Sequence, residues 1–282
     1  MFHLTILASG SSGNCALVES PNCRLLIDGG LSARQMALRL EQCGIAPSAI
    51  DGILLTHEHC DHATGLDVWC KQFHTPIYCN RLTAEVLRSS SAPELKKDWR
   101  VFATGSAFAI GDISIESFTI PHDAADPVGF TLHCGGAALG FLTDLGFATR
   151  LACERVRAVH TLVIETNHDE KLLQNDTRRP WPVKQRIMSR HGHLSNAAAA
   201  EVIAGLLGSS LRQVVLGHLS RDCNTPELAL AAVRGKLQSQ GVDAVVEVTC
   251  AAQGQISARQ LIGLAEREAP RVYEQGMLWS TS

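Results

Sequence analysis

The stretch Ile53-Leu54-Leu55-Thr56-His57-Glu58-His59-Cys60-Asp61-His62 decides the fold, because a short apolar strand runs directly into a cluster of metal-binding side chains. In an extended segment alternate side chains lie on the same side, so His57 and His59 can bind one cation. Asp61 and His62 can then turn toward a second cation. Imidazole nitrogens and carboxylate oxygens suit zinc, or manganese where more carboxylate and water take part. A solvent-exposed polar loop is the alternative, but four metal-binding residues within six positions favour a site.

The composition is that of a chain with a large buried core. Of the 282 residues, 45% are hydrophobic and 19% are charged, which fits one large layered α/β domain and argues against disorder. No apolar run approaches the roughly 20 residues that span a bilayer, so no membrane is expected as a partner. The net charge of −3 gives no cationic field over the whole surface, which argues against non-specific nucleic-acid binding as the main activity.

The N-terminal residues and the cysteines both predict a cytoplasmic protein. The segment Met1–Ala8 has no basic n-region and is typical of a strand, so no signal peptide is expected. The ten cysteines are scattered, and no two of them form a CxxC pair. This pattern is typical of reduced thiols rather than of a disulfide framework or a structural zinc site.

Apolar runs and turn residues divide the chain into strands and helices. The expected strands cover residues 4–8, 16–19, 24–28, 53–56, 77–79, 108–110, 113–119, 128–133, 137–143, 161–165, 213–217 and 244–248. The expected helices cover residues 32–43, 62–73, 181–189, 196–207 and 226–238. Two β-rich halves, each flanked by helices, favour an α/β fold with four αββα layers in one domain over residues 1–282. Periodicity alone does not choose this layering, which rests in part on a family resemblance.

The HxHxDH pattern of residues 57–62 resembles the signature of the metallo-β-lactamase superfamily, a group of hydrolases with the αββα fold. That family also has an aspartate at an earlier strand end, and a histidine, an aspartate and a last histidine after later strands. The chain offers, in this order, Asp28 after residues 25–27, His122 after residues 120–121, Asp144 after residues 140–143 and His218 after residues 214–217. The match therefore extends over nearly the whole chain.

The resemblance implies a site for two divalent metal ions, zinc or manganese. It assigns one ion to His57, His59 and His122, the other to Asp61, His62 and His218, and the bridging position to Asp144. Two such ions would share a hydroxide that serves as the nucleophile. Because Asp61 would bind one of these ions, the resemblance also counts it among the catalytic residues. Asp28 is expected to orient the ligand loop through hydrogen bonds.

Two further segments resemble motifs of RNase Z and indicate phosphodiester chemistry. They are Ile164-Glu165-Thr166-Asn167 and Gly192-His193-Leu194-Ser195-Asn196. The resemblance implies that Glu165 orients His193, and that His193 protonates the leaving oxygen or stabilises charge on the phosphoryl group. A histidine that merely caps a helix is the alternative. Asn167 replaces the threonine of the RNase Z motif, so tRNA processing is not implied.

Within the superfamily the chain is most similar to the YycJ/WalJ group of DNA-processing members. The segments that carry this resemblance are residues 9–14, 54–59, 121–124, 192–196 and 218–220. The group is associated with 5′→3′ exonuclease activity, so the resemblance implies a phosphodiesterase with DNA as its substrate. No insertion resembling the β-CASP domain of RNase J-type nucleases fits between Asp144 and His218, so a single domain is expected.

A basic stretch between Glu165 and His193 offers contacts for a phosphate backbone. Its candidate substrate-binding residues are Arg178, Arg179, Lys184 and Arg186. Such side chains neutralise phosphates in nucleic-acid complexes, although a solvated helix face explains a basic run equally well.

Two other features of the sequence offer weaker substrate contacts. Ser11, Ser12 and Asn14 could present hydroxyl, amide and backbone N–H groups to a phosphate, and a plain tight turn is an equal alternative. Trp181 could stack on a base, but a tryptophan in the core is the favoured interpretation.

Three other functions remain open from the sequence. A phosphodiesterase for a small cyclic or nucleotide-like phosphate would use the same metals and His193 without the basic stretch. A thioester or lactone hydrolase would use the metals but not the Glu165–His193 pair. A catalytically silent binding module is the least favoured, because all seven candidate ligands are present.

Overall fold

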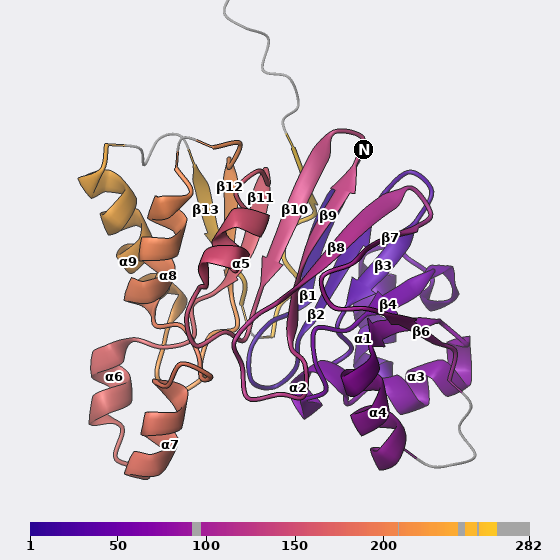
Figure 1. Cartoon of the computed structure of the whole chain (residues 1–282), viewed down its shortest axis with the longest axis horizontal. Helices are drawn as coiled ribbons and strands as arrows, with labels where there is room; N and C mark the ends of the chain where they lie inside the picture. Colours follow the sequence, from indigo (N-terminus) through magenta and orange to yellow (C-terminus); the bar gives the residue numbers. More distant parts are fainter. Residues whose placement is uncertain (92–96, 208, 242–245, 253, 264–282) are drawn as a thin grey trace, which may run out of the picture.

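Two seven-stranded sheets lie face to face in the computed structural model, which describes residues 1–91, 97–207, 209–241, 246–252 and 254–263 (Figure 1). The first sheet has the strand order β14-β1-β2-β3-β4-β5-β6. Its strands are β1 (His3–Ala8), β2 (Cys15–Glu19), β3 (Arg24–Ile27), β4 (Gly52–Leu54), β5 (Ile77–Asn80), β6 (Trp99–Phe102) and β14 (Gln260–Leu261). Strands β3 to β6 run parallel, whereas β14, β1, β2 and β3 pair antiparallel.

The second sheet has the strand order β13-β12-β11-β10-β9-β8-β7. Its strands are β7 (Ala107–Ile110), β8 (Ile113–Thr119), β9 (Val128–Cys134), β10 (Ala137–Leu142), β11 (Thr161–Glu165), β12 (Gln213–Gly217) and β13 (Glu247–Cys250). Strands β7 to β10 form an antiparallel meander, and β10 to β13 run parallel. Each sheet thus combines an antiparallel half with a parallel half.

The inner strands of both sheets are apolar on both sides because these parts of the sheets are covered on both faces. In β3, Leu25 and Ile27 belong to the core between the sheets, whereas Leu26 belongs to a separate core on the outer face. In β11, Val163 points into the central core and Leu162 to the other side. This alternation follows from the period of two along a strand.

Helices cover the outer face of each sheet (Figure 1). The helices against the first sheet are α1 (Ala33–Gln42), α3 (Leu66–Phe73) and α4 (Arg81–Ser90), which supply Met36, Trp69 and Ala84 to one core. The helices against the second sheet are α5 (Arg150–Arg155), α8 (Asn196–Gly205) and α9 (Pro226–Ser239), which supply Ala152, Ile203 and Val233 to another. The predicted αββα sandwich is therefore confirmed.

The helix predicted over residues 62–73 is wrong in its extent, because the chain forms two short helices there. The helix α2 (Cys60–Ala63) is separated from α3 by Thr64 and Gly65. A Cβ at Gly65 would lie 2.1 Å from the carbonyl oxygen of Leu31, so the chain needs glycine at this close approach of two backbones.

Several elements were not predicted. They are η1 (Pro47–Ala49), α4, β6, α5, α6 (Glu170–Asn175) and β14. The predicted helix at 181–189 is present as α7 (Trp181–Ile187). The predicted strand at 244–248 includes residues 244–245, which lie outside the described residues, and β13 begins at Glu247. Among the described helices, none has the length and apolar character that a membrane span requires.

Candidate metal centre

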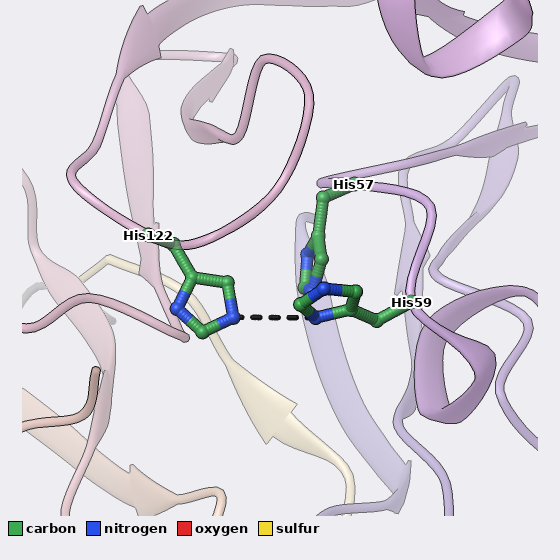
Figure 2. Close-up of side chains that lie close together, drawn as sticks. All are labelled: His57, His59 and His122. Carbon is green, nitrogen blue, oxygen red and sulfur yellow. Dashed lines mark hydrogen bonds between the residues drawn. The ribbon is translucent and has the colours of Figure 1, made fainter. Parts of the chain in front are cut away.

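Three histidines that follow β4 and β8 bring their ring nitrogens together. Nε2 of His122 lies 3.3 Å from Nδ1 of His59, and the two rings point toward one another in Figure 2. His57 lies beside them, and one nitrogen from each of the three rings falls within 4.8 Å of the others. His57 and His59 come from the segment after β4, and His122 from the segment after β8. Three converging imidazoles could hold one divalent metal ion.

A second group of ligand atoms lies directly beside the first. Asp61, His62 and His218 form one cluster, and His57, His62 and Asp144 form another, each within the same 4.8 Å limit. Oδ2 of Asp144 lies 3.0 Å from Nε2 of His62 and 3.2 Å from Nδ1 of His218. The structure therefore brings together all seven residues that the sequence predicts as ligands.

Three buried atoms of these residues have no hydrogen-bond partner in the described part of the chain. They are Nε2 of His57, and Nδ1 of His218 and Oδ2 of Asp144, which lie 3.2 Å apart as an ion pair without the geometry of a hydrogen bond. Polar atoms in protein interiors are almost always partnered, because leaving one unsatisfied costs about 1–3 kcal/mol. A bound cation would satisfy all three lone pairs, so the donor set fits a divalent metal.

Asp28 and Thr56 hold His62 in place. Oδ2 of Asp28 lies 2.7 Å from Nδ1 of His62, and the same carboxylate accepts hydrogen bonds from the backbone and hydroxyl of Thr56. Burial by itself lowers the pKa of His62, but the carboxylates of Asp144 and Asp28 hold it well above its usual value. With Nδ1 engaged by Asp28, Nε2 of His62 is left for the metal centre.

Backbone and hydroxyl groups orient two of the other rings. Nδ1 of His122 lies 3.1 Å from the carbonyl oxygen of Gly192, which leaves Nε2 for a metal. Nδ1 of His57 lies 3.0 Å from Oγ1 of Thr56. Burial lowers the pKa of both His57 and His122, which favours the neutral ring that binds a metal; at His62 a bound cation would take the place of the second ring proton.

Three site residues adopt left-handed backbone conformations just after strands. The φ angles are 63° at Asp28, 59° at Asp144 and 52° at His218. Non-glycine residues rarely take positive φ, and each such residue costs roughly 1–3 kcal/mol. Strain that recurs at two candidate ligands and at Asp28, the partner of a third, indicates that side-chain placement outweighs local backbone preference here.

The turn over residues 9–14 supports the ligands, a role that the sequence did not indicate for Ser9. Oγ of Ser9 accepts a hydrogen bond of 2.7 Å from the backbone N–H of His218. Asn14 is buried, and its Nδ2 lies 3.0 Å from Nε2 of His62, whereas Ser11 and Ser12 are exposed at the tip of the turn. Asn14 therefore contacts a candidate ligand, while the two serines face solvent.

Replacing Gly30 with alanine should damage this support. The new Cβ would lie 1.7 Å from the carbonyl oxygen of Asp61 and 2.7 Å from the backbone nitrogen of Asn14, both rigid backbone atoms. We expect the free energy of unfolding to fall by at least about 1–3 kcal/mol, the usual cost of overpacking, with a loss of bound metal. Thermal unfolding and metal analysis would measure both. The matched control is Gly235→Ala in α9, where no heavy atom would lie within 4 Å of the new Cβ, so the stability should not fall. Equal stability and equal metal content in the two variants would contradict the expectation.

Glu165 and His193 form a close pair beside the metal-binding clusters. Nδ1 of His193 lies 2.6 Å from Oε1 of the fully buried Glu165, whose other oxygen accepts the backbone N–H of Leu145 at 2.9 Å. The His193 ring lies 5.3 Å from the ring of His218, and its side chain is 22% exposed. Burial by itself lowers the pKa of His193, but Glu165 and then Asp144 raise it to about 9.

The predicted basic residues lie in three different settings. Arg178 and Arg179 pair with Asp176 and Asp222, and Lys184 is buried with Nζ donating to the carbonyl oxygen of Gln174 at 2.7 Å. Arg186 pairs with Asp123, whose other oxygen lies 3.4 Å from Nε2 of His122. Arg186 therefore lies nearest to the candidate ligands, and Lys184 does not present its ammonium group to the surface.

Comparison with known proteins places this geometry in a family. The family described as "Beta-lactamase superfamily domain" matches residues 23–219. The chain is 34% identical to Exodeoxyribonuclease YycJ of Bacillus anthracis, over 85% of this chain and 90% of that protein. It is 36% identical to Exodeoxyribonuclease WalJ of Streptococcus pneumoniae, over 81% of this chain and 85% of that protein.

Among solved structures, Zn²⁺-bound PqqB from Methylobacterium extorquens has the same fold. It superposes with a TM-score of 0.67 at 16% sequence identity, over 90% of this chain and 99% of that chain. The layered sheets, the ligand clusters at the strand ends and the matched sequence range agree. The chain belongs to the beta-lactamase superfamily and is a hydrolase with the metallo-β-lactamase fold.

Proposed function

We propose that the chain is a two-metal phosphodiesterase that removes nucleotides from DNA in the 5′→3′ direction. The observation that carries the proposal is the Glu165–His193 pair, in which Nδ1 of His193 lies 2.6 Å from Oε1 of Glu165. Both residues lie beside the candidate ligands Asp144 and His218. A thioester or lactone hydrolase needs the metals but has no use for this pair. The two exodeoxyribonuclease relatives, each similar over more than 80% of this chain, support DNA as the substrate.

In this proposal the ligand clusters hold two divalent ions, zinc or manganese. One ion would be held by His57, His59 and His122, the other by Asp61, His62 and His218, with Asp144 shared. When bound, two such ions supply activation of water near neutral pH and neutralisation of phosphate charge. Asp144 belongs to two of the clusters, which suits a shared carboxylate.

His193 supplies the proton chemistry in this proposal. Because Nδ1 is engaged by Glu165, the remaining nitrogen Nε2 is the one available to substrate. A histidine oriented in this way can donate a proton to the leaving oxygen or a hydrogen bond to the phosphoryl group. Glu165 is held in turn by the backbone N–H of Leu145, so the pair is fixed before substrate arrives.

The surface around α6 and α7 suits a nucleic-acid strand. Residues 171–190 contain six basic residues and one acidic residue, although Lys184 is buried and three of the arginines pair with Asp222 or Asp123. The expectation that Trp181 lies in the core is wrong, because 58% of this residue is exposed. Exposed tryptophan beside arginine is typical of surfaces on which unpaired bases stack.

Substitution of Trp181 tests this surface. Trp181→Ala should weaken binding of single-stranded DNA by about 5- to 150-fold, since stacking on one base is worth about 1–3 kcal/mol. Trp181→Phe should retain most of the affinity because it keeps an aromatic face. The control is Leu151→Ala on α5, a side chain that is 48% exposed and lies outside the basic segment. Fluorescence anisotropy with a labelled oligonucleotide measures the affinity, and an unchanged value for Trp181→Ala would contradict this contact.

Three substrates separate the proposed function from its alternatives. The purified protein, loaded with manganese or zinc, is incubated with 5′-phosphorylated duplex DNA, bis-p-nitrophenyl phosphate and a thioester. The proposal expects cleavage of the DNA from its 5′ end and of the simple phosphodiester. Cleavage of bis-p-nitrophenyl phosphate without DNA would favour a small phosphate substrate. Thioester cleavage with no phosphodiester cleavage would overturn the proposal.

A further inference from the structure

Three buried asparagines lie where the segments that carry Glu165, His193 and His218 meet. The exposed fractions are 5% for Asn167, 3% for Asn196 and 6% for Asn224. Asn167 follows β11, Asn196 begins α8, and Asn224 precedes α9.

Asn196 and Asn224 form a reciprocal amide pair. Nδ2 of Asn196 donates to Oδ1 of Asn224 at 2.9 Å, and Nδ2 of Asn224 donates to Oδ1 of Asn196 at 2.8 Å. Nδ2 of Asn224 also donates to the carbonyl oxygen of Thr166 at 2.7 Å, and its Oδ1 accepts the backbone N–H of Thr225. Because Thr166 follows Glu165 directly, the pair joins the Glu165 segment to the start of α8 and to the segment after β12.

Asn167 joins the segments of the two histidines. Its backbone N–H donates to the carbonyl oxygen of Leu194 at 3.0 Å, next to His193. Its side chain donates to the carbonyl oxygen of His218 at 3.1 Å, and its own carbonyl accepts the backbone N–H of Ser220 at 2.7 Å. Asn167 thus links the backbone next to His193 to the backbone of His218 through hydrogen bonds.

These bonds form one buried network with few alternative arrangements. The amides of Asn196 and Asn224 can exchange two hydrogen bonds in one relative orientation only, because the donor and acceptor of each are fixed on a planar group. Buried polar networks that are fully satisfied specify a unique geometry more strongly than apolar contacts do. At the end of this network the rings of His193 and His218 lie 5.3 Å apart at 24°.

We propose that Asn167, Asn196 and Asn224, here called the asparagine clamp, are positioning residues that fix His193 relative to His218 and the metal centre. The inference rests on the proposed function, since the reaction that the clamp serves is phosphodiester cleavage. The clamp touches no substrate and acts through the placement of His193. The amides of the clamp fix the position of the Glu165–His193 pair relative to His218. Catalytic sites generally require their groups to be placed within about 0.5 Å.

The variant Asn224→Asp tests the clamp with almost no change in shape. The carboxylate cannot donate, so it loses the bonds that Nδ2 gives to the carbonyl oxygen of Thr166 and to Oδ1 of Asn196, and its new oxygen faces these two acceptors; it can still accept from Nδ2 of Asn196. We expect kcat on DNA and on bis-p-nitrophenyl phosphate to fall about 10- to 100-fold, the scale of a small misplacement in a site, with KM and metal content unchanged. The matched control is Asn80→Asp, a buried asparagine that caps α4 and donates to Asp126. It should lower thermal stability and leave kcat as it is.

A second variant guards against simple misfolding. In Asn196→Leu/Asn224→Leu the two mutual amide bonds are removed together, so the loss of stability should come only from the backbone groups of Thr166 and Thr225 that lose a partner. The tie to Thr166 is still lost, so the double variant should fold and show the same fall in kcat. A fall in thermal stability with full kcat per folded molecule, in both variants, would overturn the inference.

Two readouts distinguish positioning from a structural role. In a His193→Ala background, Asn224→Asp should reduce kcat by less than about twofold, because coupled residues are non-additive. Equal reductions in both backgrounds would mean that the clamp does not act through His193. A crystal structure of Asn224→Asp is independent of catalysis: unaltered 2.6 Å and 5.3 Å separations of His193 from Glu165 and His218 would overturn the inference even if the proposed substrate were wrong.

Discussion

Replacing His193 with alanine should slow phosphodiester cleavage by about 10²- to 10⁴-fold, the usual contribution of a positioned general acid. The side chain pairs with the buried Glu165 at 2.6 Å, which engages Nδ1 and leaves Nε2 for the substrate. Alanine removes this donor and leaves the five imidazoles and two carboxylates of the candidate ligands in the chain. Metal content should therefore stay at the wild-type level, as measured by elemental analysis of the purified protein.

The alternative for His193 is a direct role as ligand, and the same variant separates the two roles. Nitrogen of His193 lies within 4.8 Å of ligand atoms of Asp144 and His218, so it could reach a metal. Loss of one metal equivalent in His193→Ala would mean that His193 is a ligand and that its assignment as proton donor is wrong. The control is His191→Ala, two positions earlier and exposed, which should keep both the rate and the metal.

Replacing Asp144 with asparagine should weaken metal binding by more than about 10²-fold. This loss exceeds the roughly 10- to 100-fold that usually follows when a residue that only hydrogen-bonds to a metal ligand is replaced. Oδ2 of Asp144 lies 3.0 Å from Nε2 of His62 and 3.2 Å from Nδ1 of His218. Among the described residues, Asp144 alone belongs both to the cluster that contains His62 and His57 and to the cluster that contains His218 and Glu165. The amide removes the negative charge that a bridging ligand supplies. Activity should fall with the metal.

Asparagine is a matched replacement at this position. Asp144 has a φ of 59°, and asparagine tolerates the left-handed region better than most residues, so the backbone should not change. The control is Asp112→Asn, whose carboxylate accepts from Ser20 and Asn22 at the far turn of β7 and β8. Isothermal titration with manganese measures the affinity. Wild-type affinity in Asp144→Asn would remove Asp144 from the site.

The ligand set was predictable because its members lie in the short segments that follow strands β4, β8, β10 and β12. His57 follows β4, Asp144 follows β10 and His218 follows β12, so a local pattern marks each position. Strands of one direction end at one edge of their sheet, which brings such residues together. The four layers were predictable for the same reason: strands that are apolar on both faces need a cover on both faces.

The supporting contacts were not predictable because they join residues far apart in the chain. Ser9 accepts from His218 across 209 positions, and Asn196 pairs with Asn224 across 28. Neither contact leaves a periodic pattern in the sequence. The exposure of Trp181 was equally hidden, since a tryptophan in a short helix is compatible with core and surface alike.

Titration of the metal-free protein with Mn²⁺ tests the central claim most directly. Bound metal and the rate of degradation of 5′-phosphorylated duplex DNA are measured in the same samples. We expect no cleavage in chelator, two ions bound per chain at saturation, and a rate that rises with occupancy. Full activity in chelator, or a fully loaded protein that leaves both DNA and bis-p-nitrophenyl phosphate intact, would contradict it.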